Sequence, residues 1–234
     1  MELIKKRKHY FLIFVFGLLI LSIVIFISAS FGSADITFNQ FMAIILNKIP
    51  FLRENFQSQE IIKSHEIIIW NIRLPRIILA GLVGMALSVV GAVFQGIFKN
   101  PMADPYVIGI SSGAALGATI TIVSGLSSSF FGFAFITIGS FLGATFTVFL
   151  VYKIAKAGTK LPTVTLLLSG IAISQLWSSL NSILMIFNKD KIEKIIFWVM
   201  GSISAASWRQ VLLVFPVVII GSGILYIFSR DLNV

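Results

Sequence analysis

The sequence predicts an all-α chain folded as a polytopic bundle of transmembrane helices. The 234 residues are 57% hydrophobic and only 12% charged, and the mean hydropathy is +1.00. The apolar residues also gather in runs of about 20, the length of a helix that crosses ~30 Å of hydrocarbon. A soluble domain of this size carries more charge on its surface. The bilayer is therefore expected to be much of the chain's solvent.

About six apolar runs are long enough to span the membrane. The first, residues 10–29, follows the basic run 5–8 and is too long for the apolar core of a signal peptide, so we expect an uncleaved span. The others are residues 77–98, 106–126, 130–152, 163–187 and 209–229. The connecting loops are short, and we expect residues 1–234 to form a single integral-membrane domain.

The distribution of basic residues predicts the orientation. Lys5–Lys8 precede the first span, and Lys153, Lys156 and Lys160 follow the fourth, with almost no acid among them. The basic residues of the opposite loops are mixed with Asp and Glu. The positive-inside rule then places the N-terminus in the cytoplasm. Because the net charge of +9 flanks spans and forms no basic stripe with aromatics, nucleic acid is not an expected partner.

Two segments are too short to span and are expected to be external helices. Residues 37–40, Thr-Phe-Asn-Gln, form a capping box that opens a short apolar helix ending near Leu46. Residues 189–206 are amphipathic and are expected to lie along the outer surface.

Small residues recur at every fourth position in three spans, which predicts close helix packing. Such ridges let backbones approach in lipid, where the hydrophobic effect does not drive association. Substrate contact is the alternative for these residues. The ridges comprise Ala80, Gly84, Ser88, Ala92 and Gly96 in span two, Gly109, Gly113 and Gly117 in span three, and Gly139 and Gly143 in span four.

Span five carries a polar face. At 100° per residue its polar side chains fall within one sector of ~160°, which requires polar partners or water at membrane depth. The face either lines a hydrophilic pathway or makes hydrogen bonds between helices, and no ionisable residue joins it. Its members are Ser174, Gln175, Ser178, Ser179, Asn181 and Ser182.

The turn between spans two and three contains Asp104-Pro105, an N-cap followed by a proline at the first helical position. We expect Asp104 to be a cap and not a catalytic or ion-binding acid. The chain has no cysteine and two histidines, which lie at predicted membrane edges, so no metal site is expected. A polytopic membrane enzyme is an alternative from another class. It would need a convergent set of ionisable groups at membrane depth, and only Asp104, in a turn, comes near.

An ordered series of motifs resembles one known family. The chain from Arg73 onward is similar to the FecCD or BtuC-like permeases of bacterial ABC importers for iron-siderophores, haem and vitamin B12. The motifs are RLPR at 73–76, GAVFQG at 91–96, NPMADP at 100–105, GISSGA at 109–114, LLLSG at 166–170, WVMGS at 198–202 and SWR at 207–209.

The resemblance implies a transport subunit of the bacterial cytoplasmic (inner) membrane that is not itself an enzyme. Such permeases pair with a second permease, with two cytoplasmic ATPase subunits that bind the ATP, and with an extracytoplasmic substrate-binding protein. The permease has no cofactor and moves its cargo by alternating access. An iron-siderophore is the expected cargo, and haem or cobalamin is the alternative.

The resemblance also assigns residues. Arg73 and Arg76 would meet acidic residues of the binding protein, with snorkelling at the membrane interface as the alternative. Span five, with Ser174, Gln175, Ser178, Asn181 and Ser182, would line the path. The cytoplasmic gates would lie at Asn100 and Met102 and at Pro162 and Thr163.

In length the chain departs from the family, whose members have about ten spans. The missing part includes the cytoplasmic helices that contact the ATPase. We therefore expect a fragment, or the product of a truncated or split gene, that alone does not couple to ATP hydrolysis. A non-transporting membrane scaffold is a further alternative.

Overall fold

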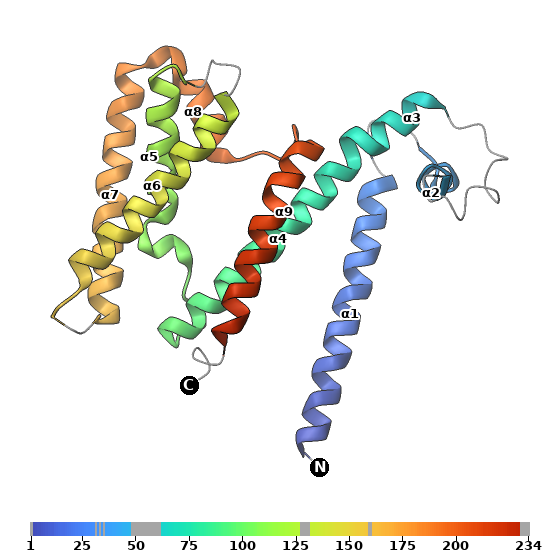
Figure 1. Cartoon of the computed structure of the whole chain (residues 1–234), viewed down its shortest axis with the longest axis horizontal. Helices are drawn as coiled ribbons and strands as arrows, with labels where there is room; N and C mark the ends of the chain where they lie inside the picture. The colour runs from blue at the N-terminus through green and yellow to red at the C-terminus, as the bar shows by residue number, and fades with distance from the viewer. Residues whose placement is uncertain are drawn as a thin grey trace. The chain divides into compact units, whose positions relative to one another are not determined.

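The computed structural model describes residues 2–30, 32, 34, 36–47, 62–126, 132–158 and 161–229. The regular elements in these ranges are helices, which confirms the predicted all-α class (Figure 1). The α-helices are α1 Glu2–Ser30, α2 Phe38–Asn47, α3 Lys63–Ile67, α4 Leu74–Phe98, α5 Ile110–Val123, α6 Gly132–Ala155, α7 Thr163–Phe187, α8 Ile192–Met200 and α9 Trp208–Ile227. A π-helix covers Ile68–Arg73, and 3-10 helices cover Pro105–Ile108 and Lys189–Lys191.

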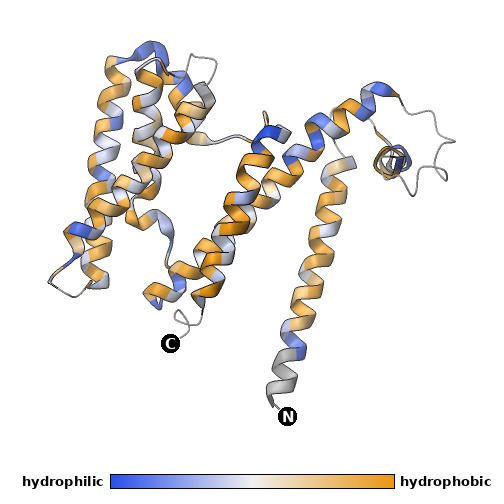
Figure 2. Ribbon diagram, in the orientation of Figure 1, coloured by the Kyte–Doolittle hydropathy of each residue, from blue (hydrophilic) through white to orange (hydrophobic). Residues whose placement is uncertain are grey.

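Within the described ranges, five helical stretches are long and apolar enough to cross a membrane. They are Lys8–Ser30, Lys63–Phe98, Ala134–Ala155, Thr163–Phe187 and Trp208–Ile227. Figure 2 shows hydrophobic colour along nearly the whole described length of α1, and none of its most apolar window is buried within the chain. Apolar surface on this scale needs lipid or another protein to cover it.

The structure shortens the helix of the predicted third span, 106–126. It is divided at Gly109, so that α5 has only 14 residues and is shorter than a full span. Gly109 has a φ of +82°, a left-handed conformation that glycine adopts without steric cost. Asp104 caps the 3-10 helix that precedes the break, because its Oδ1 accepts from the Tyr106 N–H at 2.7 Å.

The chain divides into two units, and α4 and α9 run from one into the other. Unit one comprises Met1–Met85 and Ile203–Ile220. Its core packs α2 and the π-helix against the end of α1, through Ala29, Ile36, Phe41, Ile44 and Ile69. One of the two bonds of the predicted capping box is present, since the Thr37 N–H donates to Gln40 Oε1 at 3.2 Å.

Unit two comprises Ala86–Ser202 and Gly221–Val234, and its described part is built around α5. Helices α6 and α7 pack on α5, and α8 joins them through Ile195, which is 1% exposed. The Lys191 ammonium donates to the Val123 carbonyl at 2.8 Å, at the negative end of α5. The external helix predicted over 189–206 ends earlier, at Met200, because Gly201 turns away with a φ of +71°.

Candidate functional site

The polar face predicted for span five lies on α7, and its exposed part is a narrow strip. We call Gln175, Ser178, Ser179 and Ser182 the polar strip, because all four are exposed. Ser182 Oγ donates to the Ser178 carbonyl at 3.1 Å, and Ser179 Oγ donates to the Gln175 carbonyl at 2.8 Å. Two hydroxyls are thus satisfied by their own helix, and the strip carries no charge.

Ser174 and Asn181 are separate from the polar strip, since both are half-buried against neighbouring groups. Ser174 Oγ donates to the Gly170 carbonyl at 2.8 Å. The Asn181 amide nitrogen lies 3.9 Å from Met185 Sδ, and its buried Oδ1 has no hydrogen-bond partner among the described residues. The six residues of the predicted sector therefore divide between an exposed edge and a packed edge.

A contact between α7 and α6 that sequence reasoning missed sets the rotation of α7. Trp177 Nε1 donates to Thr147 Oγ1 at 2.9 Å, and Thr147 is fully buried. Gln175 and Trp177 are 200° apart on a helical wheel, so anchoring Trp177 inside the bundle leaves Gln175 outside. The only local signal was that Thr147 extends the four-residue spacing of Gly139 and Gly143 by one step.

The break at Gly109 packs directly against α7. A Cβ at Gly109 would lie 2.7 Å from Ser174 Oγ and 3.2 Å from the Gly170 carbonyl oxygen. A Cβ at Gly170 would in turn overlap the backbone of Val107 and Ile108. Because Gly109 and Gly170 have no side chain, the 3-10 helix and α7 contact each other backbone to backbone.

The turn after α4, where the first cytoplasmic gate is expected, has a defined hydrogen-bond pattern. The Asn100 N–H bonds to the Gln95 carbonyl, and Lys99 has a φ of +47°, which together end α4 in the usual left-handed way. Asn100 Oδ1 then accepts from the Met102 N–H at 2.9 Å. The Met102 side chain is 85% exposed.

The second expected gate begins α7. Pro162 has the extended conformation of an N-cap residue, and its carbonyl accepts from the Leu166 N–H at 3.0 Å. Pro162 and Thr163 are exposed. Leu166 and Phe98 pack against one cluster of buried residues, formed by Ile108, Val151 and Ile173. This shared cluster places the two turns at the same end of unit two.

The small-residue ridges of α5 and α6 face each other. A Cβ at Gly113 would overlap Thr147, and a Cβ at Gly117 would overlap the Gly139 carbonyl. Close backbone approach of this kind is what four-residue spacing of glycine permits in a membrane.

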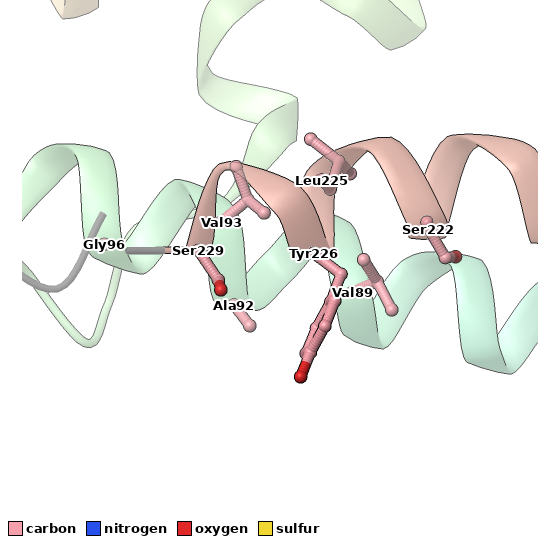
Figure 3. A pocket seen from close by; sticks show the side chains of 9 residues that line it. Val89, Ala92, Val93, Gly96, Ser222, Leu225, Tyr226 and Ser229 are labelled. Atoms are coloured by element: carbon pink, nitrogen blue, oxygen red, sulfur yellow. The ribbon is translucent and has the colours of Figure 1, made fainter. Parts of the chain in front are cut away.

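The ridge of α4 packs differently. A Cβ at Gly84 would meet nothing within 4 Å, and Ser88 is exposed. Further along, Gly96 and Ala92 line a groove of about 550 Å³ in unit two, together with the last turns of α9. Figure 3 shows Tyr226 and Ser222 on the α9 side of this groove and Val89 and Ala92 on the α4 side.

Arg73 lies in unit one and caps the end of α1. Its guanidinium donates to the carbonyls of Ala29 at 2.6 Å, Ser30 at 3.0 Å and Ala34 at 2.7 Å. The side chain is 8% exposed. The last carbonyls of a helix have no partner within the helix and carry its negative dipole end. Arg73 therefore serves α1 as a structural cation and does not face outward.

Arg76, the other basic residue of the motif, is exposed, and the proline between the two arginines explains a further contact. The Leu74 N–H bonds to the Ile69 carbonyl, five residues back, and Pro75 has no N–H. Neither Leu74 nor Pro75 can therefore donate a backbone hydrogen bond to the Trp70 carbonyl. That carbonyl instead accepts from Trp208 Nε1 at 2.7 Å. The two indole rings lie 6.3 Å apart. The motifs at 73–76 and 207–209 are thus joined in space.

Comparison with known proteins gives a consistent picture. A model of the FecCD transport family matches residues 20–234. The chain is 40% identical over 176 residues to the cobalamin import system permease protein BtuC of Halobacterium salinarum, which covers 74% of this chain and 46% of that protein. It is 34% identical over 224 residues to the molybdate import system permease protein MolB of Haemophilus influenzae, covering 94% and 62% respectively.

Two further likenesses extend over almost the whole chain. The Fe(3+)-citrate import system permease protein YfmD of Bacillus subtilis is 30% identical over 234 residues, covering 98% of this chain and 64% of that protein. A solved structure described as a metal-chelate type ABC transporter in an inward-facing conformation has a TM-score of 0.74 at 31% identity, covering 94% of this chain and 63% of that one. The chain spans about half to two thirds of the length of these proteins.

Proposed function

The chain belongs to the FecCD transport family, and from this premise we propose that it is a transmembrane permease subunit of an ABC importer for a metal chelate. The observation that carries the proposal is the continuous match over residues 20–234, which includes both units. The permease gives its cargo a path and does no chemistry on it. The ATP is bound and hydrolysed by separate ATPase subunits.

We propose the polar strip of α7 as the chain's contribution to that path. Its exposed side chains, Gln175, Ser178 and Ser182, are neutral and polar. Uncharged donors and acceptors can hydrate a passing solute without holding it tightly, as a carrier of bulky ligands requires. Ser174 and Asn181 border the strip from its packed side and support it. The turns at Asn100 and Met102 and at Pro162 and Thr163, at one end of unit two, are proposed as the cytoplasmic gate.

The partners follow from the same proposal. A second permease, identical or related, completes the path, two ATPases bind on the cytoplasmic side, and an extracytoplasmic binding protein delivers the cargo. An iron-siderophore is the cargo that we propose. Haem and cobalamin are alternatives, since relatives are named for cobalamin import and for hemin transport.

Uptake measurements test the proposal. The gene is deleted in its host, and uptake of a radiolabelled ferric siderophore, haemin and cobalamin is measured with and without a plasmid copy. Loss of uptake of one compound, restored by the plasmid, supports the proposed function and identifies the cargo. Unchanged uptake of all three compounds contradicts it and favours a membrane scaffold.

A further inference from the structure

The end of α6 carries two lysines whose ammonium groups contact aromatic rings. Lys153 and Lys156 are exposed, and neither ammonium has a hydrogen-bond or ion-pair partner among the described residues. Lys153 Nζ lies 4.7 Å from the centre of the Phe149 ring, and Lys156 Nζ lies 5.8 Å from the centre of the Tyr152 ring. A ring face attracts a cation but accepts no full hydrogen bond, so the N–H donors of both ammoniums stay available for a ligand.

Both lysines fold back along α6 instead of extending past its end. Each ring belongs to the residue four positions earlier, about one turn closer to the middle of the helix. When the N-terminus is cytoplasmic, α6 ends on the cytoplasmic side, and this earlier turn lies deeper in the membrane. A lysine near a helix end ordinarily extends its ammonium outward to water. The two ring contacts instead hold the ammoniums near the boundary between hydrocarbon and lipid headgroups.

The face of α6 that leads to these lysines is apolar and exposed in this chain. Its side chains fall within a sector of ~100° on a helical wheel, and Thr147, on the opposite side, is fully buried. The face includes Phe141, Leu142, Phe149 and Tyr152. From Leu142 to Tyr152 the helix rises roughly 15 Å, half of the ~30 Å hydrocarbon core. An acyl chain of one leaflet can therefore lie along this face while its headgroup reaches the lysines.

The charge around the two lysines favours an anionic ligand. The sequence has no acidic residue between Asp104 and Asp190, a stretch that contains all of α5, α6 and α7. Asp104 itself is engaged as a cap, through the Tyr106 N–H. An acidic protein would also be attracted to this end of α6. Ammoniums that are folded back toward the hydrocarbon nevertheless suit a ligand that itself lies in the membrane.

We propose that Lys153 and Lys156 bind the phosphate group of an anionic phospholipid, of the phosphatidylglycerol type, whose acyl chain covers the exposed face of α6. Lysine ammoniums donate charge-assisted hydrogen bonds to phosphate oxygens. The site concerns the membrane around the protein and does not depend on the identity of the cargo. On the buried side of the same helix, Val151 belongs to the cluster against which Leu166 and Phe98 pack. The lipid is therefore bound one helix away from the turns that we propose as the cytoplasmic gate.

The test titrates the full chain, purified in a mild detergent with any subunit that accompanies it and then stripped of lipid. Native mass spectrometry measures Kd for phosphatidylglycerol and for phosphatidylcholine with the same acyl chains. Lys153→Gln and Lys156→Gln should each raise Kd for phosphatidylglycerol about fivefold, and the double variant about 25-fold, while Kd for phosphatidylcholine stays the same.

Two sets of control variants accompany these substitutions. Lys153→Arg and Lys156→Arg keep the cation and should bind phosphatidylglycerol as wild type does, because a guanidinium also binds phosphate. Lys189→Gln removes one charge from an exposed position in the predicted outer segment. It should leave Kd for both lipids unchanged.

Several results would overturn the inference, and each points to a different role. Equal affinity of the wild type for the two lipids, or an equal loss with Lys189→Gln, would mean that no specific site exists. Unchanged lipid binding with a lower Tm in both lipids would leave the lysines as a cap for the dipole of α6. Unchanged lipid binding with loss of a co-purifying ATPase subunit would assign them to a protein contact. The uptake assay is independent of all these outcomes, so the proposed function is tested separately.

Discussion

The ammonium of Lys191 donates a hydrogen bond to the carbonyl of Val123, the last residue of α5, at 2.8 Å. Lys191 belongs to the short 3-10 helix that leads into α8, so this bond attaches that helix to the end of α5. Arg73 likewise caps the end of α1. Two basic residues outside the predicted cytoplasmic clusters thus have a structural use as helix caps.

Replacing Lys191 with Met should remove this cap. The apolar stem is kept while the charged donor is lost, and we expect a loss of about 1–2 kcal/mol in the free energy of unfolding. Denaturant titration of the detergent-solubilised protein measures the change. Lys189→Met, at an exposed position of the same segment, is the control and should change stability by less than about 0.5 kcal/mol. Equal effects of the two substitutions would contradict the capping role.

Alanine at Gly117 and at Gly84 should have opposite effects. At Gly117 the new methyl overlaps the Gly139 carbonyl, and forcing α5 and α6 apart should cost about 1–3 kcal/mol. At Gly84 the methyl meets nothing within 4 Å, and in a helix interior alanine is favoured over glycine by up to about 1 kcal/mol. The Tm values of both variants, measured in the same detergent, test these opposite stability changes. A destabilised Gly84→Ala would mean that the α4 ridge is also a tight contact in the assembled protein.

Gly109 and Gly125 permit a separation of backbone strain from packing. Both have a φ of +82°, but a Cβ at Gly125 meets nothing within 4 Å, whereas one at Gly109 approaches α7. Alanine at Gly125 should therefore cost only the left-handed strain of about 1–2 kcal/mol. Gly109→Ala should lower the free energy of unfolding by more than Gly125→Ala does, because its new methyl also meets α7.

The excess at Gly109 should be reduced when Ser174→Ala is added, because the nearest obstructing atom is Ser174 Oγ. The measurement compares the free energies of unfolding of Gly109→Ala, Ser174→Ala and the double variant. Identical costs at Gly109 and Gly125 would show that the joint between the 3-10 helix and α7 is loose.

Cysteine substitution tests the polar strip directly, because the chain has no native cysteine. Single cysteines at Gln175, Ser178 and Ser182 should react with a membrane-impermeant methanethiosulfonate reagent in the assembled importer. Cysteines at Leu176 and Ile183, which are exposed in this chain but apolar, should be protected by lipid. The ratio of labelling rates is the readout. Protection of all three strip positions would assign the polar groups to helix contacts and not to a path.

The sequence predicted the elements whose signals are local. The predicted span 163–187 agrees with α7, Thr163–Phe187, because Pro162 and Asn188 flank a predominantly apolar stretch with no proline or glycine pair to break it. The capping bond at Thr37 and the cap at Asp104 are likewise present, since each depends on residues within three positions.

Features that depend on contacts between distant residues could not be predicted from the sequence. The break at Gly109 was missed because apolar residues continue on both sides of it, and it is the fit against Ser174 and Gly170 that requires the break. Arg73 was predicted to face a partner because the family resemblance implies a docking role for it. Its burial follows from the π-helix and from α1, 43 residues earlier in the chain, which no local pattern reveals.

The cap that Arg73 provides has a consequence for biosynthesis. The donor for the terminal carbonyls of the first helix lies far along the chain, because Arg73 is 43 residues beyond Ser30 and belongs to the next hydrophobic segment. Before that segment packs against it, the first helix has no donor of its own for these carbonyls. The guanidinium satisfies them only once the second hydrophobic segment is in place. The cap of the first helix therefore requires the first two hydrophobic segments to pair, and a first segment on its own would lack it.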